Sequence, residues 1–186
     1  MEEKFILASS SPRRRELLLS AGQSFNIIVA DIDESFDKSL APEEVVKLLA
    51  YKKAWAVYEK EKKATLGADT IVVKSGEILG KPKDKEEAKK MLLALSGKVH
   101  QVITGVALIT DNKIVNESVT TFVKMNNLTD EFIENWINSG NAYDKAGAYA
   151  VQAGGFVSKY EGSYTNIVGL PMEKVEQLLK EFSLWQ

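Results

Sequence analysis

Apolar residues recur along the chain with two spacings, one typical of strands and one typical of helices, and the two alternate. Short apolar runs, which favour buried strands, cover Lys4–Ala8, Phe25–Ala30, Leu66–Val73 and Glu77–Leu79. A hairpin is predicted where Asp111-Asn112 separates two longer β-rich runs, Val99–Thr110 and Lys113–Met125.

Between these strands lie segments with helical spacing, and residues suited to capping precede several of them. Ser11 stands before a proline, and Asp84 and Thr129 stand before two later segments, as N-caps do. The predicted helices are Pro12–Ala21, Pro42–Lys62, Lys85–Leu95, Thr129–Ser139 and a last helix that begins at Pro171. The segment Asn141–Gly169 is rich in glycine, tyrosine and small residues, which predicts a long irregular loop of the kind that often carries function.

The alternation of strands and helices, together with one hairpin, predicts an α/β fold with a mixed sheet. The chain has 186 residues, which suffices for one domain with a sizeable core, in one or two lobes. We therefore treat residues 1–186 as a single domain.

Composition excludes several classes of site and partner. The chain has no cysteine and one histidine, so disulfides, thiolate zinc sites and histidine-rich metal sites are ruled out; a bound metal would be held by carboxylates, which suit magnesium or manganese. The formal net charge of −2 argues against a general nucleic-acid-binding surface. No apolar run approaches the length of a membrane span, and the absence of cysteine fits a reducing cytoplasm, where we expect the protein to be.

The clearest chemical signal lies between the first strand and the first helix. Residues 9–15 read Ser-Ser-Ser-Pro-Arg-Arg-Arg. Serine hydroxyls, free backbone N–H groups and guanidiniums at the positive end of a helix suit a polyphosphate. A capped helix with a solvated basic turn explains the same residues equally well.

Two carboxylates lie near strand ends. Asp69 stands inside the apolar run Leu66–Val73, where a charge is costly unless it is paired, protonated or bound to metal. Glu34 follows the second predicted strand and could equally belong to a solvated acidic loop. The simpler interpretation of Asp69 is a carboxylate that caps a turn or bonds Thr70.

Two lysines and a glutamine are weaker candidates. Lys53 lies on the long predicted helix and by itself resembles a surface lysine. Lys81 stands between Gly80 and Pro82, on a loop of low entropy that could position it for phosphate. Gln152 could read the edge of a base, although a strand glutamine bonded to backbone is the commoner case. His100 is expected to be structural.

Taken together and in order, these segments resemble the Maf family over about residues 5–180. The motifs that carry the resemblance are Leu7-Ala-Ser-Ser-Ser-Pro-Arg-Arg14, Asp33-Glu34, Leu49-Ala-Tyr-Lys-Lys-Ala54, Gly67-Ala-Asp-Thr70, Gly80-Lys-Pro82, Leu95-Ser-Gly97 with His100, Asp144-Lys-Ala-Gly-Ala-Tyr149 with Gln152, and Gly162-Ser-Tyr164 with Val168-Gly-Leu-Pro171. Members are nucleotide pyrophosphatases, historically tied to septum formation in bacteria. The family fold, which is similar to that of inosine triphosphatases, is an elongated mixed sheet flanked by helices, in two lobes with a central cleft.

The resemblance implies hydrolysis of a nucleoside triphosphate to the monophosphate and pyrophosphate, with Mg²⁺ or Mn²⁺. It assigns phosphate binding to five residues: Ser9, Arg13, Arg14, Lys53 and Lys81. It assigns the acidic, metal-suited positions to Glu34 and Asp69, with Asp69 also as the catalytic proton acceptor.

At Arg14, Thr70 and Gln152 this chain resembles the branch of the family that takes dTTP and UTP, so we expect those substrates and their modified analogues. One departure from the family pattern is Ala153 directly after Gln152, where family members commonly have glycine. The resemblance also suggests a homodimer. A nucleotide-binding regulator of cell division with little turnover is the alternative, although a pure sensor would need no base at Asp69.

Overall fold

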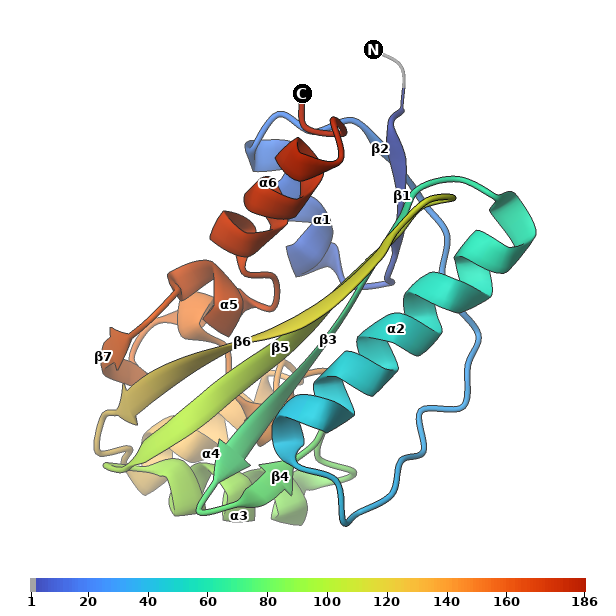
Figure 1. The fold of residues 1–186 in the computed structure, drawn as a ribbon. Helices are drawn as coiled ribbons and strands as arrows, with labels where there is room; N and C mark the ends of the chain where they lie inside the picture. Colours follow the sequence, from blue (N-terminus) through green and yellow to red (C-terminus); the bar gives the residue numbers. More distant parts are fainter. Residues whose placement is uncertain (1–2) are drawn as a thin grey trace. The chain divides into compact units, whose positions relative to one another are not determined.

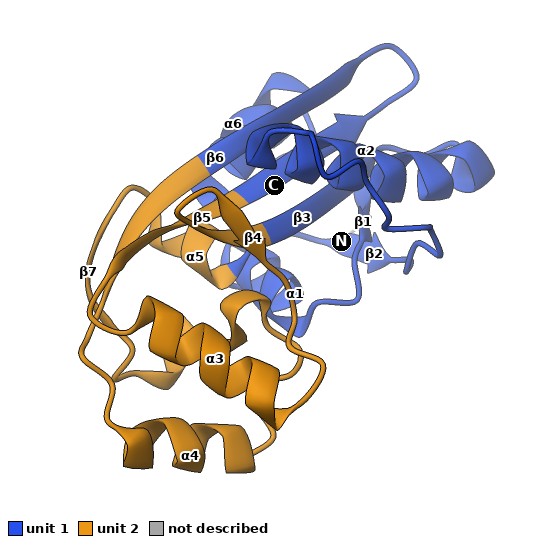
Figure 2. Ribbon diagram, turned by 90° about the horizontal axis from the view of Figure 1, so that it is seen from below, with its two compact units in different colours: residues 1–70, 104–119, 169–186 blue, residues 71–103, 120–168 orange. Residues whose placement is uncertain are grey.

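A computed structural model describes residues 3–186, and its residues group into two compact units. The first unit comprises Met1–Thr70, Thr104–Val119 and Gly169–Gln186, and the second comprises Ile71–Ile103 and Thr120–Val168 (Figure 2). Three strands, which Figure 1 labels, supply residues to both units as coloured in Figure 2, namely β3 (Thr65–Lys74), β5 (Val99–Ile109) and β6 (Ile114–Met125).

The described residues form a mixed sheet of seven strands in the order β2-β1-β3-β5-β6-β7, with β4 paired to β3. The shorter strands are β1 (Phe5–Ala8), β2 (Phe25–Ile27), β4 (Glu77–Leu79) and β7 (Val157–Glu161). Strand β1 runs parallel to β2 and β3, whereas β4 and β7 pair antiparallel with β3 and β6. The α/β class and the mixed sheet predicted from the sequence are confirmed.

All the helices of the described residues except α5 begin and end close to the predicted residues. They are α1 (Pro12–Ser20), α2 (Pro42–Glu61), α3 (Lys85–Leu95), α4 (Asp130–Asn138), α5 (Tyr164–Val168) and α6 (Met172–Glu181). The predicted N-caps Ser11, Asp84 and Thr129 each accept a hydrogen bond from a backbone N–H of the first turn, which satisfies a donor that the helix itself cannot pair.

In the first unit, alternate strand residues face different helices. Leu66, Ala68, Val106 and Leu108 pack in one cluster with residues of α1 and α6, whereas the next residues along β5, Ala107 and Ile109, pack against Ala50 and Ala54 of α2. Because strand side chains alternate between the two faces of a sheet, the position of a residue along β3 decides whether it faces α2 or the helices α1 and α6.

Two glycines let α2 lie close to the strands. A side chain at Gly67 of β3 would come within 2.4 Å of the carbonyl oxygen of Ala50 and 2.8 Å of the backbone nitrogen of Ala54. A side chain at Gly105 of β5 would come within 2.2 Å of the carbonyl oxygen of Val46. The backbone of α2 therefore sits where any larger residue would force it outward.

The second unit has a core of its own. Helices α3 and α4 contribute buried residues that pack with Val102, Val123, Tyr149 and Phe156. Phe156 makes edge-on contacts with Phe132 and Trp136, with ring centroids 5.0 Å apart in both pairs.

Two predictions about the elements are wrong. The strand expected over Phe25–Ala30 ends at Ile27. The N–H of Ile28 still bonds the carbonyl of Leu7, but β1 ends at Ala8, so residues 29 and 30 have no partner residues on β1. Ile28 and Ala30 are apolar because they pack against Ile6, Ala8 and Val57.

The loop expected over Asn141–Gly169 contains two 3₁₀ turns, Ala146–Ala148 and Val151–Ala153, as well as β7 and α5. Most residues of β7 are exposed, so its sequence lacks the apolar alternation that predicts a strand.

Within residues 3–186, no helix combines the length and the apolar character needed to cross a membrane. The prediction that residues 1–186 form one domain, and the predicted cleft between two lobes, stay predictions.

Candidate active site

Asp69 points to the α2 side of the first unit, because it follows Gly67 by two positions on β3. Its carboxylate is buried, with 9% of the residue exposed. The close contact at Gly67 holds α2 against β3, which brings Lys53, the neighbour of Ala54, over the strand. The Nζ atom of Lys53 lies 2.6 Å from Oδ1 of Asp69, so the carboxylate inside this apolar strand is paired, one of the states predicted for it.

The same lysine also holds Glu34, from the loop that follows β2. Its Nζ lies 2.8 Å from Oε1 of Glu34. The Lys53 side chain is 14% exposed and that of Glu34 is 59% exposed, so the cluster opens to solvent on the Glu34 side. The structure thus brings together three of the predicted residues, with one ammonium between two carboxylates.

Thr70 points to the opposite face of β3, where the buried guanidinium of Arg14 lies. Arg14 donates from Nη2 to Oγ1 of Thr70 at 3.0 Å, from Nη1 to Oγ of Ser9 at 3.1 Å and from Nε to the carbonyl of Gly169 at 2.8 Å. Three of its five N–H groups are thereby engaged. Burial lowers the pKa of Arg14, and the charge of Asp69 opposes that shift.

This network gives Arg14 a role that the sequence did not suggest. Its guanidinium joins the end of β1, β3 and the segment before α6, so it fixes the positions of Ser9 and Thr70 as well as supplying charge. Arg14 and Thr70, which the resemblance assigns to specificity, contact each other; their roles toward substrate stay predictions.

The turn between β1 and α1 supplies the polar end of a helix of nine residues. Ser11 accepts from the backbone N–H of Arg14 at 3.5 Å, and its own N–H donates to Oγ of Ser9 at 3.2 Å. Arg13 is half-buried, and its charge contributes to lowering the pKa of Arg14. Serine hydroxyls and adjacent guanidiniums therefore do meet at a helix N-terminus.

Sequence reasoning missed two residues in this network. Oγ1 of Thr70 lies 2.9 Å from Oγ1 of Thr104, and it also donates to the carbonyl of Gly169 at 3.2 Å. A polar residue within the apolar run of β5 was the available signal for Thr104. Gly169 has a φ of +125°, which favours glycine, but nothing in the sequence shows that its carbonyl accepts from Arg14.

Lys81 and Gln152 belong to the second unit, so their part in the same site stays a prediction. The carbonyl of Gly80 accepts from the backbone N–H of Gly147 at 3.0 Å, which ties the Lys81 loop to the 3₁₀ turn at Ala146–Ala148. Lys81 is exposed. Gln152 is also exposed and lies on the 3₁₀ turn Val151–Ala153, so the strand placement considered for it is wrong.

His100 is structural, as expected. The imidazole is 3% exposed, and its Nε2 lies 2.8 Å from the hydroxyl of Tyr149 within the second unit. Burial, helped by the charge of Lys74, lowers the pKa of His100 to about 4, so the ring is neutral at pH 7.

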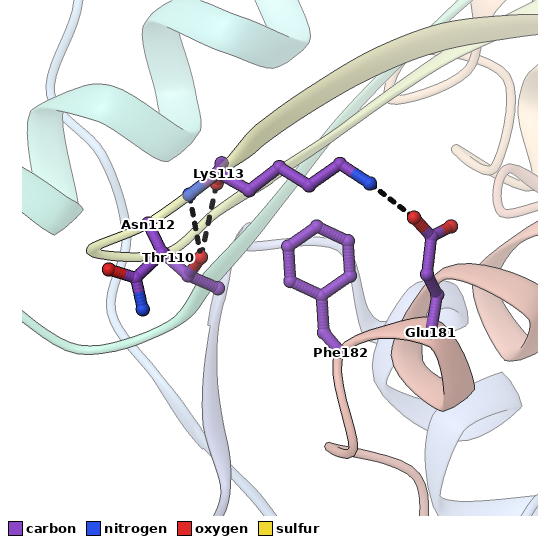
Figure 3. Close-up of a pocket in the computed structure, with 5 residues that line it drawn as sticks. All are labelled: Thr110, Asn112, Lys113, Glu181 and Phe182. Atoms are coloured by element: carbon purple, nitrogen blue, oxygen red, sulfur yellow. Dashed lines mark hydrogen bonds and ion pairs between the residues drawn. The ribbon is translucent and has the colours of Figure 1, made fainter.

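The placement of possible metal ligands and one further hollow of the described chain bear on where a site could lie. Residues 3–186 contain no group of three or more histidine or acidic side chains placed to hold a metal. Figure 3 shows a hollow lined by the turn after β5 and the end of α6, in which Lys113 is joined to Glu181 and lies 5.2 Å from the ring centre of Phe182. None of the predicted site residues lines this hollow.

The family model described as "Maf-like protein" matches residues 4–182. The chain belongs to this family. A dTTP/UTP pyrophosphatase of Ruminiclostridium cellulolyticum is 49% identical to the Maf-like chain, over 96% of this chain and 95% of its own length. One of Acetivibrio thermocellus is 46% identical, over 97% and 96%. Among solved structures, a HAM1 protein from Coxiella burnetii overlaps 98% of this chain and 99% of its own with a TM-score of 0.49 at 14% identity, and this overlap adds nothing to the assignment.

Proposed function

We propose that this protein hydrolyses dTTP and UTP to the monophosphate and pyrophosphate. The relatives named dTTP/UTP pyrophosphatase are similar over nearly their whole length, which supports the substrate and the reaction. The observation in the structure that carries the chemistry is the contact of Lys53 with both Glu34 and Asp69. The charges of these two carboxylates also act on the guanidinium of Arg14 in the first turn of α1.

The residues of the first unit suit a triphosphate. Arg13, Arg14 and Lys53 supply positive charge, and Ser9 and Ser11 supply hydroxyls at a helix N-terminus, which together favour phosphate oxygens. Phosphoryl chemistry depends chiefly on position and electrostatics. The fixed guanidinium of Arg14, bonded at 2.8–3.1 Å to three partners, meets the first of these needs.

Asp69 is the proton acceptor in this proposal. A water molecule attacks the α-phosphorus, its proton passes to the Asp69 carboxylate, the bond between the α-phosphorus and the bridging oxygen breaks, and pyrophosphate leaves. A general base must lie within hydrogen-bond reach of the proton that it accepts. In the protein without substrate, the contact with Lys53 fixes the position of the Asp69 carboxylate.

The acidic pair fits a magnesium or manganese ion. Mg²⁺ is usually held by one or two carboxylates, with waters and substrate phosphates as its other ligands. Glu34 and Asp69 offer two carboxylates that converge on one point, the Lys53 ammonium. A metal held by them would supply charge that stabilises the departing pyrophosphate.

Base selection is assigned to Thr70 and Gln152, with Arg14 fixing the position of Thr70. The hydroxyl of Thr70 contacts Arg14, Thr104 and Gly169, so its position is closely defined. Lys81 completes the phosphate-binding set in this proposal.

The test is a product assay with dTTP, UTP and GTP in the presence of Mg²⁺ or Mn²⁺. We expect monophosphate and pyrophosphate, fastest from dTTP and UTP. Release of orthophosphate and nucleoside diphosphate would contradict attack at the α-phosphorus. Binding without any release would instead favour the regulatory alternative.

A further inference from the structure

We infer that Lys53 is an exchangeable counter-ion, which occupies the metal position between Glu34 and Asp69 and must leave it before a divalent cation can bind there. The inference deepens the proposed function, on which it rests. It concerns the order and coupling of binding events at the same site.

The first step is geometric. The ammonium of Lys53 lies 2.6 Å from Asp69 Oδ1 and 2.8 Å from Glu34 Oε1, at full hydrogen-bond contact with both. A divalent cation that bridges the same two oxygens would lie where the ammonium now lies. The two cations also repel each other, so they compete for the same oxygens.

The second step concerns what the lysine can do once released. Lysine carries its charge on a flexible stem of four carbons, so Lys53 can turn without movement of α2. Helix α2 itself is held by the contacts at Gly67 and Gly105. The released ammonium then needs a new partner, and a phosphate group of the substrate is the partner that the proposed reaction provides.

The third step is thermodynamic. Metal alone must displace Lys53 with nothing to receive its charge, whereas metal that arrives with a triphosphate gives the ammonium a new anionic partner. Binding of metal and binding of triphosphate therefore support each other, and this coupling is reciprocal. The empty protein would accordingly hold a divalent cation weakly.

The neighbouring lysine provides a matched control. Lys52 contacts the same loop as Lys53. Its Nζ donates to the backbone carbonyls of Asp33 and Ser35, at 3.3 Å each, whereas Lys53 contacts the carboxylates of Glu34 and Asp69. Removal of either lysine lowers the net charge by the same amount, so a general electrostatic effect on metal binding would be similar for both.

The experiment measures Mn²⁺ binding to the full chain without nucleotide, by the loss of the electron paramagnetic resonance signal of free Mn²⁺. For Lys53→Met we expect affinity to rise about tenfold, within the usual range of coupling between sites, whereas Lys52→Met should bind at most slightly more tightly than the unsubstituted protein. Lys53→Arg keeps a positive charge at this position, so it should bind Mn²⁺ as weakly as the unsubstituted protein does. Addition of Glu34→Gln to Lys53→Met should reverse the gain.

Several results would overturn the inference. An affinity of Lys53→Met equal to or below that of the unsubstituted protein means that the lysine does not compete with metal. An equal gain in Lys52→Met means that the effect is general, and a gain that survives Glu34→Gln means that Mn²⁺ binds elsewhere. Circular dichroism checks folding, and Lys53→Gln replaces the methionine variant should that variant not fold.

The outcome is separable from the proposed function, because no turnover is measured. If the protein releases pyrophosphate from dTTP but Lys53→Met gains no affinity for Mn²⁺, only the counter-ion role fails. If Lys53→Met gains affinity for Mn²⁺ but the unsubstituted protein hydrolyses no nucleotide, the proposed function fails and the counter-ion role stands.

Discussion

The contact of α2 with Gly67 offers a direct test of how the fold positions Lys53. In Gly67→Ala, the new methyl group would lie 2.4 Å from the carbonyl oxygen of Ala50 and 2.8 Å from the backbone nitrogen of Ala54. The first distance is about 1 Å shorter than an ordinary van der Waals contact. Both atoms belong to the helix backbone, so no side-chain rotation relieves the overlap, and α2 must move outward.

The cost follows from that overlap. Overpacking by one methyl group destabilises a well-packed core by about 1–3 kcal/mol, and the lower entropy of the unfolded alanine chain offsets up to about 1 kcal/mol of it. Because the overlap is with backbone atoms that cannot rotate away, we take the upper part of the overpacking range, about 2–3 kcal/mol. The net loss is then about 1–3 kcal/mol, which lowers the Tm of a chain of this length by about 2–12 °C. A shift of about 1 Å in α2 would also move Lys53 away from Asp69, and misplacement of that size can slow a reaction up to about 100-fold.

Differential scanning calorimetry measures the first effect and the rate of pyrophosphate release from dTTP measures the second. Gly80→Ala is the control for Tm, because a side chain there meets none of the described atoms within 4 Å and needs no positive φ. The reasoning is refuted if Gly67→Ala has the Tm and the turnover rate of the unsubstituted protein. A fall in Tm with unchanged turnover would separate the packing from the position of Lys53.

Four further substitutions test individual residues. Asp69→Asn cannot accept a proton, so we expect dTTP turnover to fall about 10²- to 10⁴-fold with an unchanged circular dichroism spectrum; near-native turnover, or an unfolded variant, would remove Asp69 from this role. Gln152→Ala should narrow the ratio of kcat/KM between dTTP and GTP by about tenfold or more, and an unchanged ratio would contradict base reading at this position. Arg14→Lys keeps the charge but cannot bond Ser9, Thr70 and Gly169 at once, so Tm should fall by several degrees and KM should rise; an unchanged Tm would show that the three bonds contribute little. His100 takes up a proton near pH 6.5 in the unfolded chain but only near pH 4 when folded. The free energy of unfolding should therefore fall as the pH is lowered from 6.5 to 4, by about 1.4 kcal/mol per pH unit and about 3 kcal/mol in all. The His100→Gln variant should lose this dependence, and identical pH profiles of Tm for the variant and the unsubstituted protein would contradict the assignment.

The sequence predicts helix ends better than strand ends, for a local reason. Ser11, Asp84 and Thr129 act on backbone donors within three residues, so the cap and its effect are visible together in the chain. A strand ends where its partner ends. Residues 29 and 30 have no partner on β1, which ends at Ala8, and nothing in the sequence of residues 28–30 shows that the partner strand has ended.

In the candidate site, too, local features could be predicted from the sequence and contacts between distant segments could not. Asp69 and Thr70 are neighbours on β3, so alternation along the strand places them on opposite faces. The pairing of Lys53 with two carboxylates depends on how closely α2 approaches β3, which is a property of packing between segments. The bond from Arg14 to the Gly169 carbonyl joins residues 155 positions apart and involves a backbone oxygen, which every residue carries.

That last bond sets a limit on when the site can form during synthesis. The first unit is assembled from three stretches of chain, the last of which is Gly169–Gln186. At about 5–20 residues per second, a ribosome makes Ser9 and Arg14 many seconds before it makes their most distant partner. Until Gly169 and α6 emerge, the buried guanidinium lacks one of its acceptors and the cluster with Leu66 and Ala68 lacks the residues of α6. The complete Arg14 network can therefore form only after Gly169 has been made, so under the proposed function a nascent chain that stops short of Gly169 would lack an intact phosphate-binding turn.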